Sequence, residues 1–128
     1  EFRRVLFRSP GDMREQSKSF LAQSLNAVIT QTLVRTPDGR ARRAVVEIML
    51  MTRAIAKLIM TDQTHQIAAQ LQTGKDLGMQ MMDQALMDAI QKKQIDPDDA
   101  FRFASDKSIF QKFVTDTSVL PKFEVSGT

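Results

Sequence analysis

The chain has 128 residues, of which 42% are hydrophobic, and it contains no cysteine. This length allows one domain with a modest core, and the lack of cysteine excludes disulfides and thiolate metal sites. The formal net charge is +3. No apolar run approaches the roughly 20 residues that span a bilayer, and no secretory signal peptide is visible.

Residues 1–9 account for most of the net positive charge of the chain. Their sequence, Glu-Phe-Arg-Arg-Val-Leu-Phe-Arg-Ser, resembles the in-frame translation of a sequencing-adapter end, so we exclude it from the fold reasoning. Without its three arginines and one glutamate, 15 basic and 14 acidic residues remain, a net charge of +1. That balance is weak support for nucleic-acid binding. The alternative is a native basic arm that binds anionic partners. An adapter abutting Pro10 would make the chain the C-terminal piece of a longer protein.

The first element is predicted to be a helix that begins at Asp12, with Glu15 completing a capping box. Its expected apolar face consists of Phe20, Leu21, Leu25 and Val28. β-branched residues then become frequent, which favours a strand. The change from helix to strand is expected between residues 26 and 31.

A β-hairpin is predicted around the turn Pro37-Asp38-Gly39, because Pro fixes φ, Asp bonds nearby backbone and Gly accepts positive φ. Residues 44–51 alternate with a period of two, and their nearly continuous apolar character predicts a second strand covered on both faces. Three arginines follow the turn: Arg40, Arg42 and Arg43. They are interpreted as a solvated hairpin end, with contact to an acidic neighbour or phosphate as the alternative.

Two short helices are predicted directly after the hairpin. The first begins after the N-cap residue Thr52, and the second follows a break at Thr61-Asp62 and ends near Gly74, where a C-terminal cap belongs. The residues expected to face inward are Ile55, Leu58 and Ile59 in the first helix and Ile67, Ala68 and Leu71 in the second.

An amphipathic helix is predicted from Gly78 to about Lys93, and its apolar stripe is expected to organise the surrounding packing. Asp96-Pro97 predicts the start of another helix, with a capping side chain followed by Pro at the first helical position. Asp106 begins a last short helix, and no period is sustained from Thr115 on. The inward positions are expected to be Met79, Met82, Leu86 and Ile90, then Ala100, Phe103 and Ala104, and finally Phe110, Phe113 and Val114.

Sequence motifs for catalysis are absent from the chain. It has no Gly-x-x-x-x-Gly-Lys-Ser/Thr phosphate loop and no Gly-x-Gly-x-x-Gly, so it lacks the backbone cradle that holds nucleotide phosphates. His65 is the single histidine and is predicted to be a surface residue, because a metal site needs several converging ligands. The eight methionines are interpreted as core filling rather than as a binding groove.

Several stretches resemble PilT-type ATPases, the hexameric motors that retract type IV pili, with PilU as a sister group. The most telling stretches are 64–67 (Thr-His-Gln-Ile), 71–74 (Leu-Gln-Thr-Gly) and 78–86 (Gly-Met-Gln-Met-Met-Asp-Gln-Ala-Leu). The stretches 24–33, 38–40 and 44–49 agree with the family in order and spacing. The resemblance covers residues 12 to 114.

The resemblance implies an α+β, mostly helical fold. Residues 10–51 would form a helix and hairpin at the C-terminal edge of a RecA-like ATPase core, residues 52–114 a C-terminal bundle of short helices, and residues 115–128 an irregular tail. The family's Walker A, Asp-box, Walker B and His-box motifs precede the position of Pro10. The resemblance therefore implies no catalytic, cofactor-binding or metal residue in this chain, with ATP and Mg²⁺ belonging to the full-length protein.

The resemblance also implies a setting for the full-length protein. It would be a homo-hexamer in the cytoplasm, peripheral to the inner membrane as part of the pilus machinery, with no nucleic-acid partner. Two alternatives stay open. One is a stand-alone helical interaction module with no catalytic activity, and the other is a nucleic-acid binder that uses Arg40, Arg42, Arg43 and Arg53.

The family's retraction segment, Ala-Ile-Arg-Asn-Leu-Ile-Arg-Glu, corresponds to residues 54–61. Its apolar positions are kept, whereas its polar positions are replaced by Ala56, Lys57, Met60 and Thr61. We expect this segment to pack the helical bundle and to couple it to the ATPase core, in a PilT-like or a PilU-like protein. The candidate residues are Ala54, Ile55, Lys57, Leu58 and Ile59.

Overall fold

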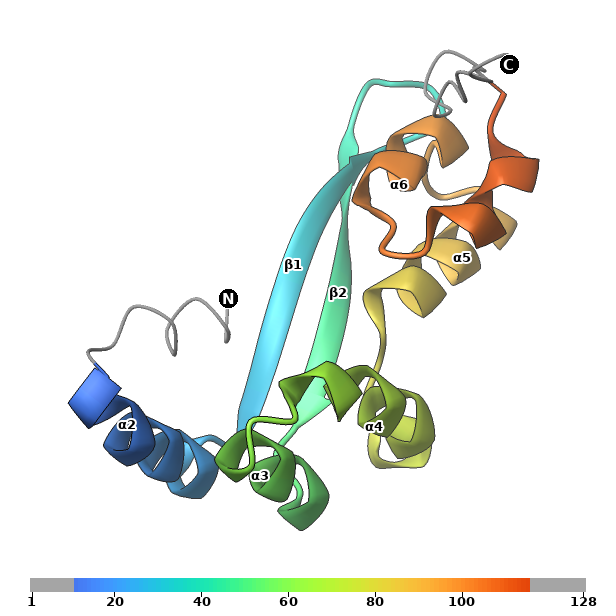
Figure 1. Cartoon of the computed structure of the whole chain (residues 1–128). Helices are drawn as coiled ribbons and strands as arrows, with labels where there is room; N and C mark the ends of the chain where they lie inside the picture. Colours follow the sequence, from blue (N-terminus) through green and yellow to red (C-terminus); the bar gives the residue numbers. More distant parts are fainter. Residues whose placement is uncertain (1–10, 116–128) are drawn as a thin grey trace, which may run out of the picture. The chain divides into compact units, whose positions relative to one another are not determined.

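The computed structural model describes residues 11–115 (Figure 1). The adapter-like residues 1–9 and almost all of the predicted tail lie outside this range. The elements are α2 (Gly11–Ser24), β1 (Ala27–Arg35), β2 (Arg42–Leu50), α3 (Arg53–Met60), η1 (Thr64–Gln66), α4 (Ile67–Thr73), η2 (Gly74–Leu77), α5 (Met82–Gln91), α6 (Pro97–Phe103) and η3 (Lys107–Phe113). The described chain is thus mostly helical with one two-stranded hairpin, as predicted.

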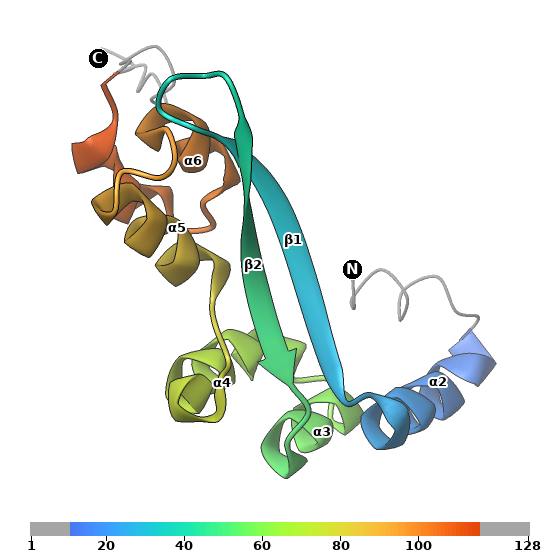
Figure 2. The ribbon, with the colours of Figure 1, turned by 180° about the vertical axis from the view of Figure 1, so that it is seen from behind.

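The chain divides into two compact units, and each strand of the hairpin contributes to both. Within the described residues, the first unit comprises residues 11–30 and 47–81, and the second comprises residues 31–46 and 82–115. Figure 2 shows the two hairpin strands side by side. The expected boundary between residues 51 and 52 concerns the domains of the whole family protein, and it remains a prediction.

Strand β1 begins at Ala27, within the range expected from the sequence, whereas α2 already ends at Ser24, before that range. The inner face of the helix also differs from the prediction. Leu25 and Val28 lie beyond the helix, and Phe20 is 68% exposed. Lys18 is buried instead. Phe20 lies two residues later and points to the opposite side of the helix, because each residue turns the helix by about 100°. The helix already includes Gly11, so Asp12 lies in its first turn and the predicted capping box is wrong.

The hairpin turn is closed by the chemistry that its sequence predicts. Gly39 has a φ of 69°, and the Thr36 amide donates to the Ala41 carbonyl at 2.9 Å. The Asp38 carboxylate accepts hydrogen bonds from the Thr36 hydroxyl and from the Arg40 amide, and these two bonds, in that order of size, lower the pKa of Asp38.

Strand β2 is less covered than predicted. Val45 and Met49 are buried and the three residues between them are half-buried, but Ala44 is exposed. Among residues 11–115 the sheet has two strands, and the one further pairing on β2 is the bridge from Ile48 to Gln80, so most of the cover there comes from helices.

The first unit closes around α3. Its N-cap is Thr52, whose hydroxyl oxygen accepts a hydrogen bond from the Ile55 amide at 3.2 Å, as predicted. The core of this unit consists of Met49, Ile55, Ile59, Leu71 and Met79. In α4, Leu71 is buried as expected, whereas Ala68 is exposed.

Helix α5 begins at Met82, four residues later than predicted. Gly78 has a φ of 95°, which no right-handed helix contains, and Gln80 then pairs with Ile48 through two backbone hydrogen bonds of 2.9 and 3.0 Å. Met79 therefore packs in the core of the first unit and does not share a helical face with Met82. That part of the prediction is wrong.

The second unit has the larger core. Its buried members are Val34, Val45, Met82, Leu86, Ala89, Ile90, Ile95, Ala100, Phe101, Ala104 and Phe110. Asp96 caps α6 as predicted, by accepting from the Asp98 amide at 3.1 Å. Phe103 was expected inside and is 43% exposed, because Phe101 takes the buried position on that helix.

Two carboxylates of the second unit bind backbone amides at the ends of its elements. The Asp99 carboxylate accepts from the Arg35 amide at 2.9 Å, and the Asp96 amide donates to the Arg35 carbonyl at 2.8 Å. Both backbone groups at the end of β1 are thus satisfied by α6. Asp106 caps η3 by accepting from the Ser108 amide, and Phe110 is fully buried as predicted.

Candidate functional site

The five candidate residues all lie on α3, where they divide between two faces. Ile55 and Ile59 are fully buried and Leu58 is 8% exposed, whereas Ala54 and Lys57 are exposed. The helix is amphipathic because its apolar residues recur at spacings of three and four. The structure thus brings the candidates together as one helix with a buried side and an open side.

The buried side anchors α3 in the first unit. Ile55 and Ile59 contact a cluster that includes Met49 of β2 and Leu71 of α4. Burying one such side chain contributes about 1.5–3 kcal/mol. The helix is therefore fixed to both the hairpin and α4.

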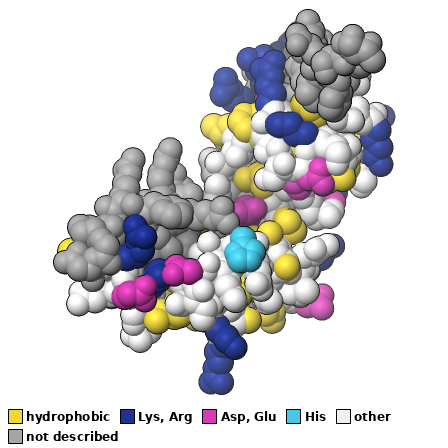
Figure 3. All heavy atoms as spheres, in the orientation of Figure 1, with side chains coloured by type: hydrophobic (Ala, Val, Ile, Leu, Met, Phe, Trp, Pro, Cys, Tyr) yellow, Lys and Arg dark blue, Asp and Glu magenta, His cyan; other side chains and the backbone are white. Residues whose placement is uncertain are grey.

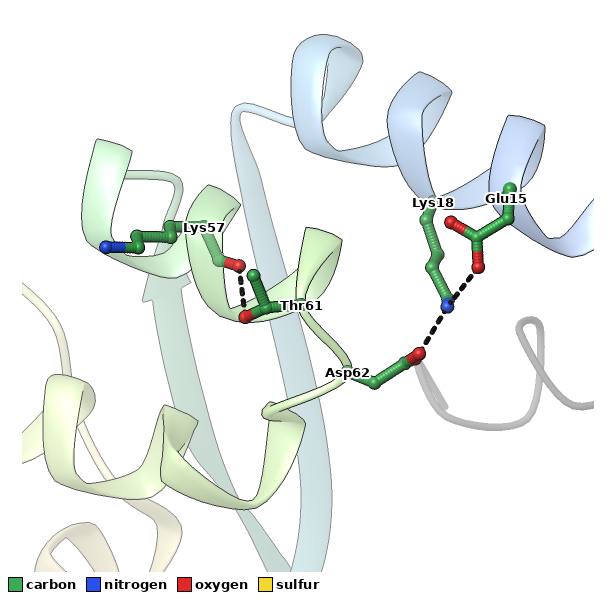
Figure 4. Close-up of polar contacts among 5 residues, drawn as sticks. All are labelled: Glu15, Lys18, Lys57, Thr61 and Asp62. Carbon is green, nitrogen blue, oxygen red and sulfur yellow. Dashed lines mark hydrogen bonds and ion pairs between the residues drawn. The ribbon is translucent and has the colours of Figure 1, made fainter.

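The open side of α3 carries Arg53, Ala54, Lys57 and Met60, and Met60 is 42% exposed. The Lys57 side chain points away from α2 in Figure 4, and none of the ion pairs found among residues 13–115 includes it. Its backbone carbonyl accepts from the Thr61 amide at 3.0 Å and from the Thr61 hydroxyl at 2.8 Å, which closes the last turn of the helix.

A polar cluster joins α2 to the end of α3 (Figure 4). The Lys18 ammonium donates to the Asp62 carboxylate at 2.6 Å and to the Glu15 carboxylate at 2.8 Å. These two hydrogen bonds, with Asp62 the larger, raise the pKa of Lys18 against the opposing effect of burial. The carboxylates are 70% and 72% exposed, so water screens the attraction.

The Lys18 cluster was missed by the sequence reasoning. Glu15 and Lys18 are three residues apart on one helix, which is a visible local pattern. Asp62 lies 44 positions from Lys18, and no periodicity or motif joins the two.

The titratable side chains outside the Lys18 cluster lie on the surface or take part in capping and packing. Within residues 13–115 no group of three or more His, Asp or Glu side chains lies close enough to hold a metal ion. His65 is exposed on η1, and the arginines after the hairpin turn are exposed as well. Acidic and basic side chains are interspersed on the surface of the first unit in Figure 3. The helices between residues 11 and 115 do not include one with the length and apolar character of a bilayer-spanning segment.

Comparison with known proteins extends this description. No protein-family model matches the chain. A twitching motility protein of Neisseria gonorrhoeae is 41% identical over 95 residues, which are 74% of this chain and 25% of that protein. Two proteins of Pseudomonas aeruginosa also match: the type IV pilus ATPase PilU at 36% over 101 residues, and the type IV pilus retraction ATPase PilT at 38% over 97 residues.

The chain belongs to the PilT/PilU family. The sequence resemblance is thereby confirmed. The alignments cover 79% of this chain and 26% of PilU, and 76% of this chain and 28% of PilT. The chain therefore spans about a quarter of the length of these relatives.

Solved structures of two ATPases share the fold of the chain. The pilus retraction motor PilT with bound ADP superposes with a TM-score of 0.71 at 24% identity, over 84% of this chain and 29% of that one. The Legionella pneumophila ATPase DotB superposes with a TM-score of 0.60 at 17% identity, over 79% of this chain and 27% of that one.

Proposed function

We propose that the chain is part of an ATP-hydrolysing motor that powers type IV pilus retraction and twitching motility. The observation that carries this proposal is the identity of 36–41% with the three pilus and twitching relatives over about three quarters of the chain. The role assigned to the chain is mechanical: it couples the ATPase core to the pilus machinery.

Nucleotide chemistry belongs to the rest of the whole protein. The chain has no phosphate loop, and phosphoryl transfer needs a loop and a Lys to hold the phosphates and an acid to hold Mg²⁺. ATP and Mg²⁺ accordingly bind outside residues 10–128. The whole protein works as a homo-hexamer in the cytoplasm, peripheral to the inner membrane.

The hairpin is the part of the chain that continues the core. On β1, Ile29 is 66% exposed and Leu33 is 46% exposed. The unpaired backbone groups of an edge strand invite pairing with another strand, and exposed apolar side chains make such an edge prone to aggregation, so natural proteins usually cover it. In the whole protein the remainder of the RecA-like core provides this cover.

Helix α3 is the coupling element. Its buried side fixes it to the hairpin and to α4, so a displacement of the core moves the helix as a body. Its open side, with Ala54 and Lys57, is free to contact the pilus machinery or a neighbouring subunit. These buried apolar contacts would transmit a displacement of the core to α3, because protein interiors are close-packed.

The first test is to recover the contiguous upstream coding sequence. A phosphate loop and a Walker B acid are expected within about 200 residues of Pro10, since hydrolysis needs both. The whole protein should then hydrolyse ATP. An open reading frame that starts near Met13, together with cooperative unfolding of residues 10–128 alone, would instead identify a stand-alone helical interaction module.

A further inference from the structure

Helix α3 ends in a Schellman motif in which Asp62, and not glycine, occupies the left-handed position. The Gln63 amide donates to the Leu58 carbonyl at 2.8 Å, and the Asp62 amide donates to the Ile59 carbonyl at 3.4 Å. Asp62 occupies the left-handed position of the motif, with a φ of 58°. Glycine is usual there because it has no Cβ, and any other residue carries a steric cost.

The side chain of Asp62 makes a contact that glycine could not make. Its carboxylate lies 2.6 Å from the Lys18 ammonium, on a helix 44 residues earlier in the chain (Figure 4). Asp tolerates the left-handed region better than most residues, so the backbone conformation and the contact are compatible. The steric cost is thus offset by a charge-assisted hydrogen bond between two elements.

Lys18 is placed where an apolar residue would be the ordinary choice. It is buried on the side of α2 that also carries Ala22, which packs against the core of the first unit. A buried ammonium needs partners to compensate for lost hydration, and Lys18 has two, Asp62 and Glu15. An apolar residue at this position would pack against α3 but could not fix the end of the helix.

We infer that Lys18 is a positioning residue that fixes the C-terminal end of α3 against α2. This inference rests on the proposed coupling function, because α2 belongs to the part expected to continue the ATPase core and α3 carries the retraction segment. The apolar contacts of Ile55 and Ile59 hold the body of the helix, and Lys18 sets where its end lies.

A second helix of the chain shows that a charge swap between positions 18 and 62 is compatible with the backbone. Helix α5 ends in the same motif, with Lys93 at the left-handed position and a φ of 55°. A lysine is therefore tolerated at that position, and the charge swap Lys18→Glu with Asp62→Lys is compatible with the backbone. In the swap one ammonium again lies between two carboxylates, those of residues 15 and 18.

Hydrogen exchange of the 128-residue chain gives the first readout. Lys18→Met is expected to accelerate exchange of the Thr61 and Gln63 amides on the order of threefold, while Lys18→Arg and the charge swap stay near the wild-type rates. The Gln80 amide, which donates to the Ile48 carbonyl at 3.0 Å in the first unit, reports that this unit remains folded in each variant. Unchanged exchange in Lys18→Met, or a swap as fast as Lys18→Met, would overturn the inference.

The second readout is the whole protein. Lys18→Met is expected to lower twitching several-fold with ATP hydrolysis retained, and Lys18→Arg is expected to restore twitching. Accelerated exchange with unchanged twitching would refute a positioning role in the motor. A wild-type protein without ATP hydrolysis would refute the proposed function instead, and the exchange result would still decide whether Lys18 fixes α3.

Discussion

Replacing Gly74 by alanine is expected to destabilise the chain because of the neighbouring Met79 side chain and not because of the backbone conformation of Gly74. Its φ is −83°, which alanine adopts without strain. A Cβ added there would lie 2.6 Å from the Met79 Sδ atom and 3.0 Å from its Cγ and Cε atoms. Met79 is 4% exposed and lies in the core of the first unit, so its side chain has little room to move.

The change in the free energy of unfolding caused by Gly74→Ala is the sum of two opposing effects. Replacing Gly by Ala at a compatible backbone position stabilises a protein by about 0.4–1 kcal/mol. Forcing an extra carbon into a packed core costs about 1–3 kcal/mol. Gly74→Ala should therefore destabilise the chain by about 1 kcal/mol, and in a Met79→Ala background the same substitution should stabilise it by about 0.5 kcal/mol.

Urea unfolding of the four proteins in this double-mutant cycle measures the reversal of sign. Gly39→Ala is the matched control, because its φ of 69° penalises alanine while no atom lies within 4 Å of the added Cβ. Its cost should be the same in both backgrounds. Stabilisation by Gly74→Ala in the presence of Met79 would show that the close approach does not limit this position.

Substitutions at four further positions test other parts of the structure. Ile59→Ala should cost about 2–5 kcal/mol in urea unfolding, whereas Lys57→Ala should stay within about 0.5 kcal/mol of the wild type. Asp99→Ala should cost about 1–3 kcal/mol by leaving the Arg35 amide unpaired, and Asp99→Asn, which keeps an acceptor oxygen, should cost less. Because the pKa of Asp38 is lowered by folding, its stabilisation is present above the ordinary pKa of 3.8 and is lost as the pH falls through the lowered value. Asp38→Asn should flatten that acid dependence in thermal unfolding, and an unchanged slope would contradict the assignment.

Local signals in the sequence predict most element boundaries. The caps at Thr52, Asp96 and Asp106 and the turn at Gly39 depend on residues within three positions of one another, and all four are found. Side-chain capping and turn chemistry need no tertiary information. The mostly helical fold with one hairpin follows from these elements.

The errors arise where distant contacts decide the outcome. The helical spacing from Met79 to Met82 suggested a continuous helix, but Gln80 pairs with Ile48 and Gly78 adopts a positive φ. Gly74 was correctly placed at the end of a helix, yet the close approach of Met79 depends on how the chain folds back. Such contacts are set by tertiary packing, which overrides local propensity.

Only the locally determined part of the candidate site could be predicted from the sequence. The buried side of α3 follows from its apolar spacing, and Ile55, Leu58 and Ile59 are buried as expected. The contact between Lys18 and Asp62 joins positions 44 residues apart, which periodicity cannot reveal. The coupling role of the α3 residues themselves stays a prediction.

The most direct test of the proposed function measures ATP hydrolysis and twitching together for the whole protein. The gene should restore twitching to a strain that lacks its retraction ATPase, and Lys57→Glu on the open side of α3 should reduce twitching while hydrolysis stays near the wild-type rate. Failure of the wild-type gene to restore twitching, or equal loss of hydrolysis and twitching in Lys57→Glu, would contradict a mechanical role for this part of the protein.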